Sequence, residues 1–159
     1  MSDITIERLN GNFRRWDELL DLILASFAYM NGRIDPPSSA LALTPLSLEE
    51  KARREIGYVA LDDDRIAGCI FCRAEPDSLY IGKLAVLPST QGKGIGKRLL
   101  TCAEAEARKQ RRRILRLETR IELTENHATF AAWGFAKTAE NSHPGFERTT
   151  SIEMQKLLS

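Results

Sequence analysis

Three glycines alternate with other residues in the segment QGKGIGKR, residues 91–98, which follows an apolar stretch and Pro88. Glycine lets a turn adopt a positive φ and leaves backbone N–H groups unscreened by side chains. A helix-forming run rich in Ala, Leu, Glu and Arg begins directly afterwards, and the N-terminus of a helix attracts anions. The segment therefore predicts a binding site for phosphate oxygens, with Lys93, Lys97 and Arg98 adding positive charge at its rim.

Two widespread phosphate-binding loops do not match these residues. The P-loop pattern G-x-x-x-x-G-K-[ST], aligned on Gly96 and Lys97, requires a glycine at Gln91 and a hydroxyl at Arg98. The dinucleotide pattern G-x-G-x-x-G requires a glycine at Lys97 or at Leu99, depending on the glycine from which it starts. The sequence thus supports neither ATP hydrolysis nor dinucleotide redox chemistry.

A second segment of interest is TENHATFAAWGF, residues 124–135, which follows the glycine loop after one intervening predicted strand. Each of its residues has an ordinary structural explanation. Asn126 helps to start a helix, and Phe130, Trp133 and Phe135 pack in a core. Their occurrence after a glycine loop and one strand favours a second part of the same ligand site.

Together the two segments resemble the GNAT superfamily of acyl-CoA-dependent N-acetyltransferases. The family pattern [Q/R]-x-x-G-x-[G/A] matches Gln91, Gly94 and Gly96. The family's second segment, Asn-x-x-x-Tyr-x-x-x-Gly-Phe, resembles residues 126–135, with Phe130 in place of the tyrosine. The resemblance extends over the whole chain in the order of its elements, and it is weakest near the N-terminus.

The resemblance implies acetyl-CoA as co-substrate and no metal. Its pantetheine arm would lie as an extra strand along LAVLP, residues 84–88, and its pyrophosphate on the N–H groups of residues 92–97. The residues implied to hold it are Leu84, Ala85, Val86, Gln91, Gly92, Lys93, Gly94, Ile95, Gly96, Lys97, Asn126 and Phe130.

The implied reaction is direct attack by a primary amine of a small molecule or peptide on the thioester, in a ternary complex. Glu118 is our first choice of general base. Phe130 cannot donate a proton to the leaving thiolate, so that part of the family mechanism does not transfer. Tyr80, His127 and His143 remain as donors, or the thiolate leaves unprotonated.

The acceptor pocket is less well defined by the sequence. Arg33 and Asp35, in a long loop near the N-terminus, and His143 and Arg148, between the last two predicted strands, are the candidates for contacts with the acceptor. Two alternatives stay open beside the enzyme: a non-catalytic CoA-binding or regulatory module, and a pure interaction domain.

The pattern of apolar and turn residues predicts the elements that position these residues. It indicates one α+β domain spanning residues 1–159, with a mixed, mostly antiparallel sheet flanked by helices. The predicted strands are residues 4–9, 57–64, 65–75, 78–87, 112–120, 134–140 and 148–156, and the predicted helices are residues 13–30, 47–55, 92–110 and 124–133. Ser47 and Glu50 form a predicted capping box at the start of the second helix. Residues 31–45 are predicted to be a loop.

Composition sets the remaining expectations. The net charge is +1 and no apolar run is long enough to span a membrane, so we expect neither nucleic acid nor membrane as a partner. No signal peptide is evident, and three cysteines fit a reduced, cytoplasmic setting. Cys69 and Cys72 lie on a predicted strand, where they point to opposite faces and cannot share a metal. The oligomeric state stays open, a homodimer included.

Overall fold

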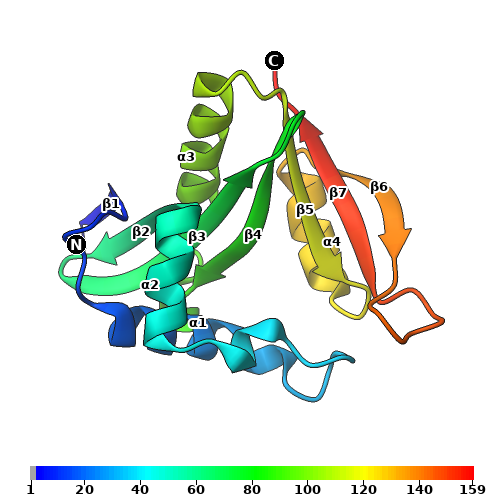
Figure 1. Cartoon of the computed structure of the whole chain (residues 1–159), viewed down its shortest axis with the longest axis horizontal. Helices are drawn as coiled ribbons and strands as arrows, with labels where there is room; N and C mark the ends of the chain where they lie inside the picture. Colours follow the sequence, from blue (N-terminus) through cyan, green and yellow to red (C-terminus); the bar gives the residue numbers. More distant parts are fainter. Residues whose placement is uncertain (1–2) are drawn as a thin grey trace.

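A seven-stranded sheet runs through the computed structural model, which describes residues 3–159, in the order β1-β2-β3-β4-β5-β7-β6 (Figure 1). The strands are β1 (Ile4–Arg8), β2 (Ile56–Asp62), β3 (Arg65–Ala74), β4 (Ser78–Val86), β5 (Ile114–Arg120), β6 (Ala136–Asn141) and β7 (Ser151–Leu157). The helices are α1 (Trp16–Phe27), α2 (Pro45–Arg54), α3 (Ile95–Lys109) and α4 (Thr124–Ala132). The predicted α+β class and mostly antiparallel sheet are confirmed.

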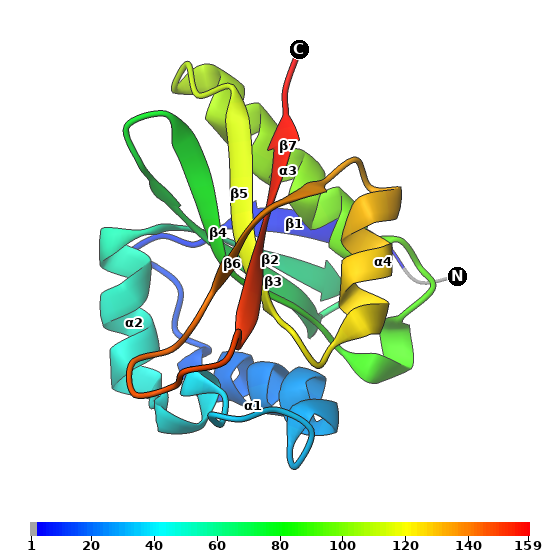
Figure 2. The same ribbon diagram turned by 90° about the vertical axis from the view of Figure 1, so that its right-hand side faces the viewer.

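Helices cover both faces of the sheet and divide its core into two layers. On one face α1 packs against β3 and β4, and α2 packs on α1 and β2, around Leu19, Ile23 and Phe71. On the other face α3 packs across β2, β3, β4 and β5, around Leu99 and Leu115. Figure 2 shows α1 and α2 on the opposite side of the sheet from α3. Each helix thus buries its apolar stripe against the apolar side chains of one sheet face.

The two cysteines of β3 point into different layers, as predicted. Cys69 packs on the face covered by α1 and α2, whereas Cys72 packs on the face covered by α3. Burial raises the pKa of both thiols to about 12. In residues 3–159 no group of three or more His, Cys, Asp or Glu side chains is arranged to hold a metal ion. No helix of the same range is long and apolar enough to cross a membrane.

The central feature of the sheet is the parallel contact between β4 and β5. Pairing covers only Ser78–Ile81 on β4 and Ile114–Leu117 on β5, after which the strands separate. Figure 1 shows them side by side where they begin and diverging toward their carboxyl ends. The last residues of β4 therefore have a strand neighbour on the β3 side and an opening on the other.

The boundaries of the first two helices differ from the predictions. The first α-helix is residues 16–27, followed by one 3₁₀ turn, and not residues 13–30. The second begins at Pro45, not Ser47, because Thr44 is its N-cap and forms a capping box with Ser47. Proline is well suited to the first helical position, since its missing N–H would have no acceptor there. The predicted loop also contains a 3₁₀ turn at Ser39–Ala42.

Candidate functional site

The glycine loop lies at the start of α3 with its backbone amides exposed. Gly92 and Gly94 have φ values of 89° and 76°, and nothing lies within 4 Å of where a Cβ atom would be at either position. The N–H of Arg98 donates to the carbonyl of Gly94 at 3.0 Å as the first helical hydrogen bond. The preceding amides of the first turn therefore have no acceptor within the helix, and no side chain caps them. This is the geometry of an anion site.

Two of the three cations expected at the rim are directed elsewhere. The ammonium of Lys93 lies 3.2 Å from a carboxylate oxygen of Asp62. The guanidinium of Arg98 donates to the carbonyl of Ile4 at 3.0 Å. Lys97 is the third, and it lines the cavity described next.

A cavity of about 890 Å³ extends from the glycine loop to the open edge of β4, bounded by α1 and α4. All of the residues expected to hold the co-substrate line it except Ala85 and Lys93. At Gly96 a Cβ atom would lie 3.3 Å from the Trp133 ring and 3.5 Å from Val86. Glycine at this position thus allows α3 to approach α4 and β4 closely.

The open edge of β4 presents the backbone of alternate residues. The N–H of Leu87 donates to Ala67 on the β3 side at 2.8 Å, whereas the N–H of Val86 donates to the hydroxyl of Ser26 on α1 at 3.1 Å. Since amides of successive strand residues point to opposite edges, Leu84 and Val86 face the opening and Ala85 faces β3. Of the three residues expected to contact the pantetheine arm through their backbone, Leu84 and Val86 therefore face the opening and Ala85 does not.

A second cavity, of about 340 Å³, adjoins the first on the face of the sheet covered by α1 and α2. The residues that line both cavities are Phe27, Met30, Leu84, Asn126 and Phe130. The amide nitrogen of Asn126 donates to the hydroxyl of Tyr29 at 3.0 Å. The Phe130 ring packs edge-to-face on Trp133 and Phe135, with centroids 5.9 and 5.8 Å away. A ligand that fills the first cavity would thus reach the second beside Phe130.

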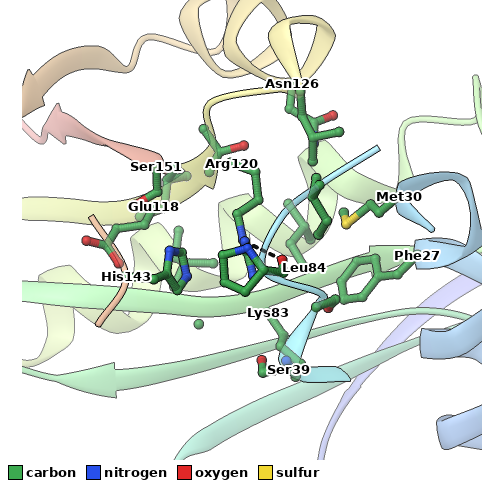
Figure 3. Close-up of a pocket in the computed structure, with 18 of the residues that line it drawn as sticks. Phe27, Met30, Ser39, Lys83, Leu84, Glu118, Arg120, Asn126, His143 and Ser151 are labelled. Atoms are coloured by element: carbon green, nitrogen blue, oxygen red, sulfur yellow. Dashed lines mark hydrogen bonds between the residues drawn. The ribbon is translucent and has the colours of Figure 1, made fainter. Parts of the chain in front are cut away.

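All three residues expected to be catalytic line this second cavity (Figure 3). Glu118 lies one residue beyond the last β5 residue paired with β4, and Asn141 donates to one of its carboxylate oxygens at 2.8 Å. The ring of Tyr80 lies between the guanidiniums of Arg73 and Arg116, at 4.7 and 4.3 Å from its centroid. Burial, followed by the nearby Glu118 carboxylate, raises the pKa of Tyr80, which keeps its phenol protonated near neutral pH.

His143 lies beside Glu118 and Arg120 in the cavity (Figure 3). Its Nδ1 is hydrogen-bonded to the hydroxyl of Thr150, and its backbone N–H donates to the same hydroxyl at 2.8 Å. Burial, followed by the charge of Arg120, lowers the pKa of His143 below its ordinary value of 6.5. The imidazole is therefore mostly neutral at pH 7, and a neutral imidazole is a poor proton donor.

The other residues expected to bind an acceptor form ion pairs outside the cavity lining. Arg33 pairs with Glu125 at 2.7 Å, and Arg148 lies 3.3 Å from Asp35 and 3.8 Å from Glu122. These pairs attach the loop after α1 to the first turn of α4 and to the β6–β7 loop. Within residues 3–159, the cavity lining includes His143 but none of Arg33, Asp35 and Arg148. Their place in the structure is to hold the loop over the site.

The sequence prediction missed two cations of the cavity, Lys83 and Arg120. Arg120 donates to the carbonyls of Pro36 and Pro37 at 2.7 and 3.1 Å, and burial lowers the pKa of its guanidinium. Arg120 could have been predicted from the sequence, because it lies two residues after Glu118 and alternate residues of a strand share a face. Lys83 lies directly before the strand segment that the resemblance identified.

Comparison with known proteins agrees with this geometry. The sequence profile of the acetyltransferase (GNAT) family matches residues 16–135, about three quarters of the chain. The chain therefore belongs to the GNAT acetyltransferase family. A search of curated proteins finds no match to the sequence.

Several solved structures share the fold. The PaiA N-acetyltransferase from Thermoplasma acidophilum, in complex with coenzyme A, superposes with a TM-score of 0.78 and 18% identity, covering 96% of this chain and 99% of that one. A GNAT acetyltransferase from Elizabethkingia anophelis with acetyl-CoA bound gives 0.70 and 21%, covering 98% of each chain. The ribosomal-protein-S18-alanine N-acetyltransferase from Escherichia coli gives 0.71 and 18%, covering 99% and 95%.

Proposed function

We propose that this protein transfers the acetyl group of acetyl-CoA to a primary amine of a small molecule or peptide, by direct attack in a ternary complex. The observation that supports this most directly is the meeting of two cavities at Leu84 and Phe130. One of them runs from an anion site at the start of α3, and the other contains ionisable side chains. Relatives of the same fold that hold coenzyme A or acetyl-CoA support the choice of co-substrate.

Each part of the larger cavity has a task in this proposal. The free amides at the start of α3, with Lys97, bind the pyrophosphate. The backbone of Leu84 and the carbonyl of Val86, whose N–H is bonded to Ser26, pair with the amides of the pantetheine arm, which lies along β4 where β5 has diverged. The N–H of Leu84 polarises the thioester carbonyl, as a fixed donor directed at the oxygen that gains charge. Asn126 and Phe130 line the arm near its thiol end.

Proton transfer is the task of the smaller cavity. Glu118 takes the proton of the attacking amine, directly or through one water, with its carboxylate held by Asn141. His143, being mostly neutral, is the less suitable acid, and Tyr80 stays protonated beside Glu118. A thiol has a pKa of ~8.5, so its thiolate is a good leaving group near neutral pH without a donor. We therefore assign no essential general acid, in keeping with Phe130 at the family's tyrosine position.

The same phenylalanine is the one feature that favours the alternative, a non-catalytic CoA-binding module. An assay of thiol release from acetyl-CoA against a panel of primary amines separates the two. Turnover with any amine supports the transferase. Binding of CoA, seen as a higher melting temperature, without turnover supports the module. A ligand at 100 times its Kd stabilises the native state by about 2.7 kcal/mol, so the absence of any thermal shift would contradict both.

A further inference from the structure

Lys83 is a cation of the smaller cavity that forms no hydrogen bond or ion pair with any residue in the described range 3–159. Figure 3 shows its side chain at the cavity wall near Ser39. Burial, followed by the charge of Lys51, lowers the pKa of its ammonium. The carboxylate that acts on the charge of Lys83, Glu55, is bonded to Lys51 at 2.7 Å. Two ammonium groups thus share one carboxylate, and the one that faces the cavity lacks a direct counter-charge.

The register of the sheet places Lys83 and Glu118 on the same face. Tyr80 pairs with Arg73 and Lys83 with Phe71, because a bulge at Gly82 adds one residue to β4. Tyr80 and Lys83 therefore point to the same side, as do Arg116, Glu118 and Arg120 on β5. All of these side chains lie on the face covered by α1 and α2.

Lys83 on β4 and Glu118 on β5 border the opening between the two strands. Glu118 lies one residue beyond the last paired position of β5, Leu117, and Lys83 lies two residues beyond that of β4, Ile81. Neighbouring strands are ~4.8 Å apart, and these two strands are diverging, so their side chains border a space a few ångströms wider than that. When the amine of an acceptor lies at Glu118, a second group a few bonds away in the same molecule reaches Lys83.

The smaller cavity has more positive than negative side chains in its lining. Its lining in residues 3–159 holds one carboxylate, Glu118, and two basic side chains, Lys83 and Arg120, besides a mostly neutral His143. The hydrogen bonds of Arg120 go to neutral carbonyls, although Asp35 and Glu122 lie near enough to act on its charge. An amine without an acidic group would leave Lys83 desolvated and unpaired, which is costly.

Resting on the proposed function, we infer that the acceptor is a small amine that also carries an anionic group, a carboxylate, which pairs with Lys83 while the amine lies at Glu118. A volume of about 340 Å³ is at the small end of ligand pockets. The loop held by Arg120 forms one of its walls, which favours a free small molecule of amino-acid size over a peptide.

The test uses acceptors that differ only in the acid. Amino acids are compared with their carboxamides, and phosphoethanolamine with ethanolamine, by kcat/KM at saturating acetyl-CoA. A charged hydrogen bond is worth enough to give the wild type a preference of about 10- to 100-fold for the carboxylate member. Lys83→Met, which keeps an unbranched side chain one atom shorter and removes the charge, brings this ratio near one, whereas Lys83→Arg retains it. Lys109→Met, at the exposed end of α3, is the matched control and retains it too.

Several results would overturn the inference and leave the transferase intact. The first is equal turnover of an amino acid and its carboxamide, and the second is a ratio of carboxylate to carboxamide that is unchanged in Lys83→Met. The others are a higher kcat/KM for phosphoethanolamine than for amino acids, and a higher kcat/KM for peptides than for amino acids. If no amine is acetylated, the proposed function fails, and calorimetry then tests the subsite alone. Amino acids should bind the CoA-loaded wild type and not the CoA-loaded Lys83→Met protein. Equal binding to both would refute the inference, and an unchanged CoA-induced thermal shift shows that the variant is folded.

Discussion

Gly94 allows the proposed phosphate site to be tested by charge alone. It is the N-cap of α3, its φ is 76°, and no atom lies within 4 Å of where its Cβ would be. Asn and Asp tolerate this left-handed conformation better than other side chains and are nearly the same size. The pair Gly94→Asn and Gly94→Asp therefore has the same backbone strain, of about 1–2 kcal/mol, and differs by one negative charge at the anion site.

The expected loss follows from Coulomb's law. A carboxylate about 5 Å from one phosphate charge, at an effective dielectric constant of 20, is repelled by about 3 kcal/mol. We expect Gly94→Asp to raise the Kd for CoA at least about 100-fold, which corresponds to ~2.7 kcal/mol. Gly94→Asn should raise it less than about tenfold. The two unliganded variants should melt within a few degrees of each other.

The assay is isothermal titration calorimetry with CoA and with pantetheine, which lacks the pyrophosphate. Pantetheine affinity should be the same for the wild type and both variants, since the change lies at the other end of the cavity. A folded Gly94→Asp protein that binds CoA within about threefold of the wild type would refute the phosphate site. Equal losses of CoA affinity for Asn and Asp would show that backbone geometry, and not charge, is responsible.

Four further predictions concern the smaller cavity and the loop above it. Phe130→Tyr should change kcat by less than about tenfold, or ~1.4 kcal/mol of barrier, because no general acid is assigned; a larger gain, measured at saturating amine, would show that the reaction lacks a donor it needs. If Tyr80 is that donor, Tyr80→Phe should lower kcat by about 10²- to 10⁴-fold, and a smaller effect supports the thiolate leaving unprotonated. The pKa of His143 is lowered from 6.5 in the folded protein, so the unfolded chain binds more protons near that pH. The stability that this residue contributes is therefore present above pH 6.5 and is lost as the pH falls through the lowered pKa. His143→Gln should flatten the dependence of Tm on pH between about 7 and 5, and an unchanged slope would contradict this. Arg148→Gln should raise KM for the acceptor severalfold with the Kd for CoA changed less than about twofold. The reason is that the ion pairs of Arg148 with Asp35 and Glu122 hold the loop and do not line the larger cavity. Equal effects on both constants would argue against that role.

The parts of this protein that the sequence alone predicts are those governed by neighbouring residues. The glycine loop at the start of α3 is predictable because positive φ values, free amides and the beginning of a helix all depend on residues close in the chain. The opposite orientation of Cys69 and Cys72 follows from the alternation of a strand in the same way. Local rules failed at Pro45, where two N-cap signals lie three residues apart and the earlier one, Thr44, starts the helix.

The composition of the smaller cavity was decided by contacts between distant segments. Arg33 and Glu125 are 92 residues apart, and Arg148 and Asp35 are 113 apart, so nothing in the sequence near either pair shows that they bind each other and not an acceptor. Lys83 reaches the cavity only because a bulge at Gly82 sets its side, and because β5 leaves β4 after Ile81. Strand register and divergence are set by the packing of whole elements, with a free energy summed over many non-local contacts, and for that reason only the tertiary structure could show which charges meet there.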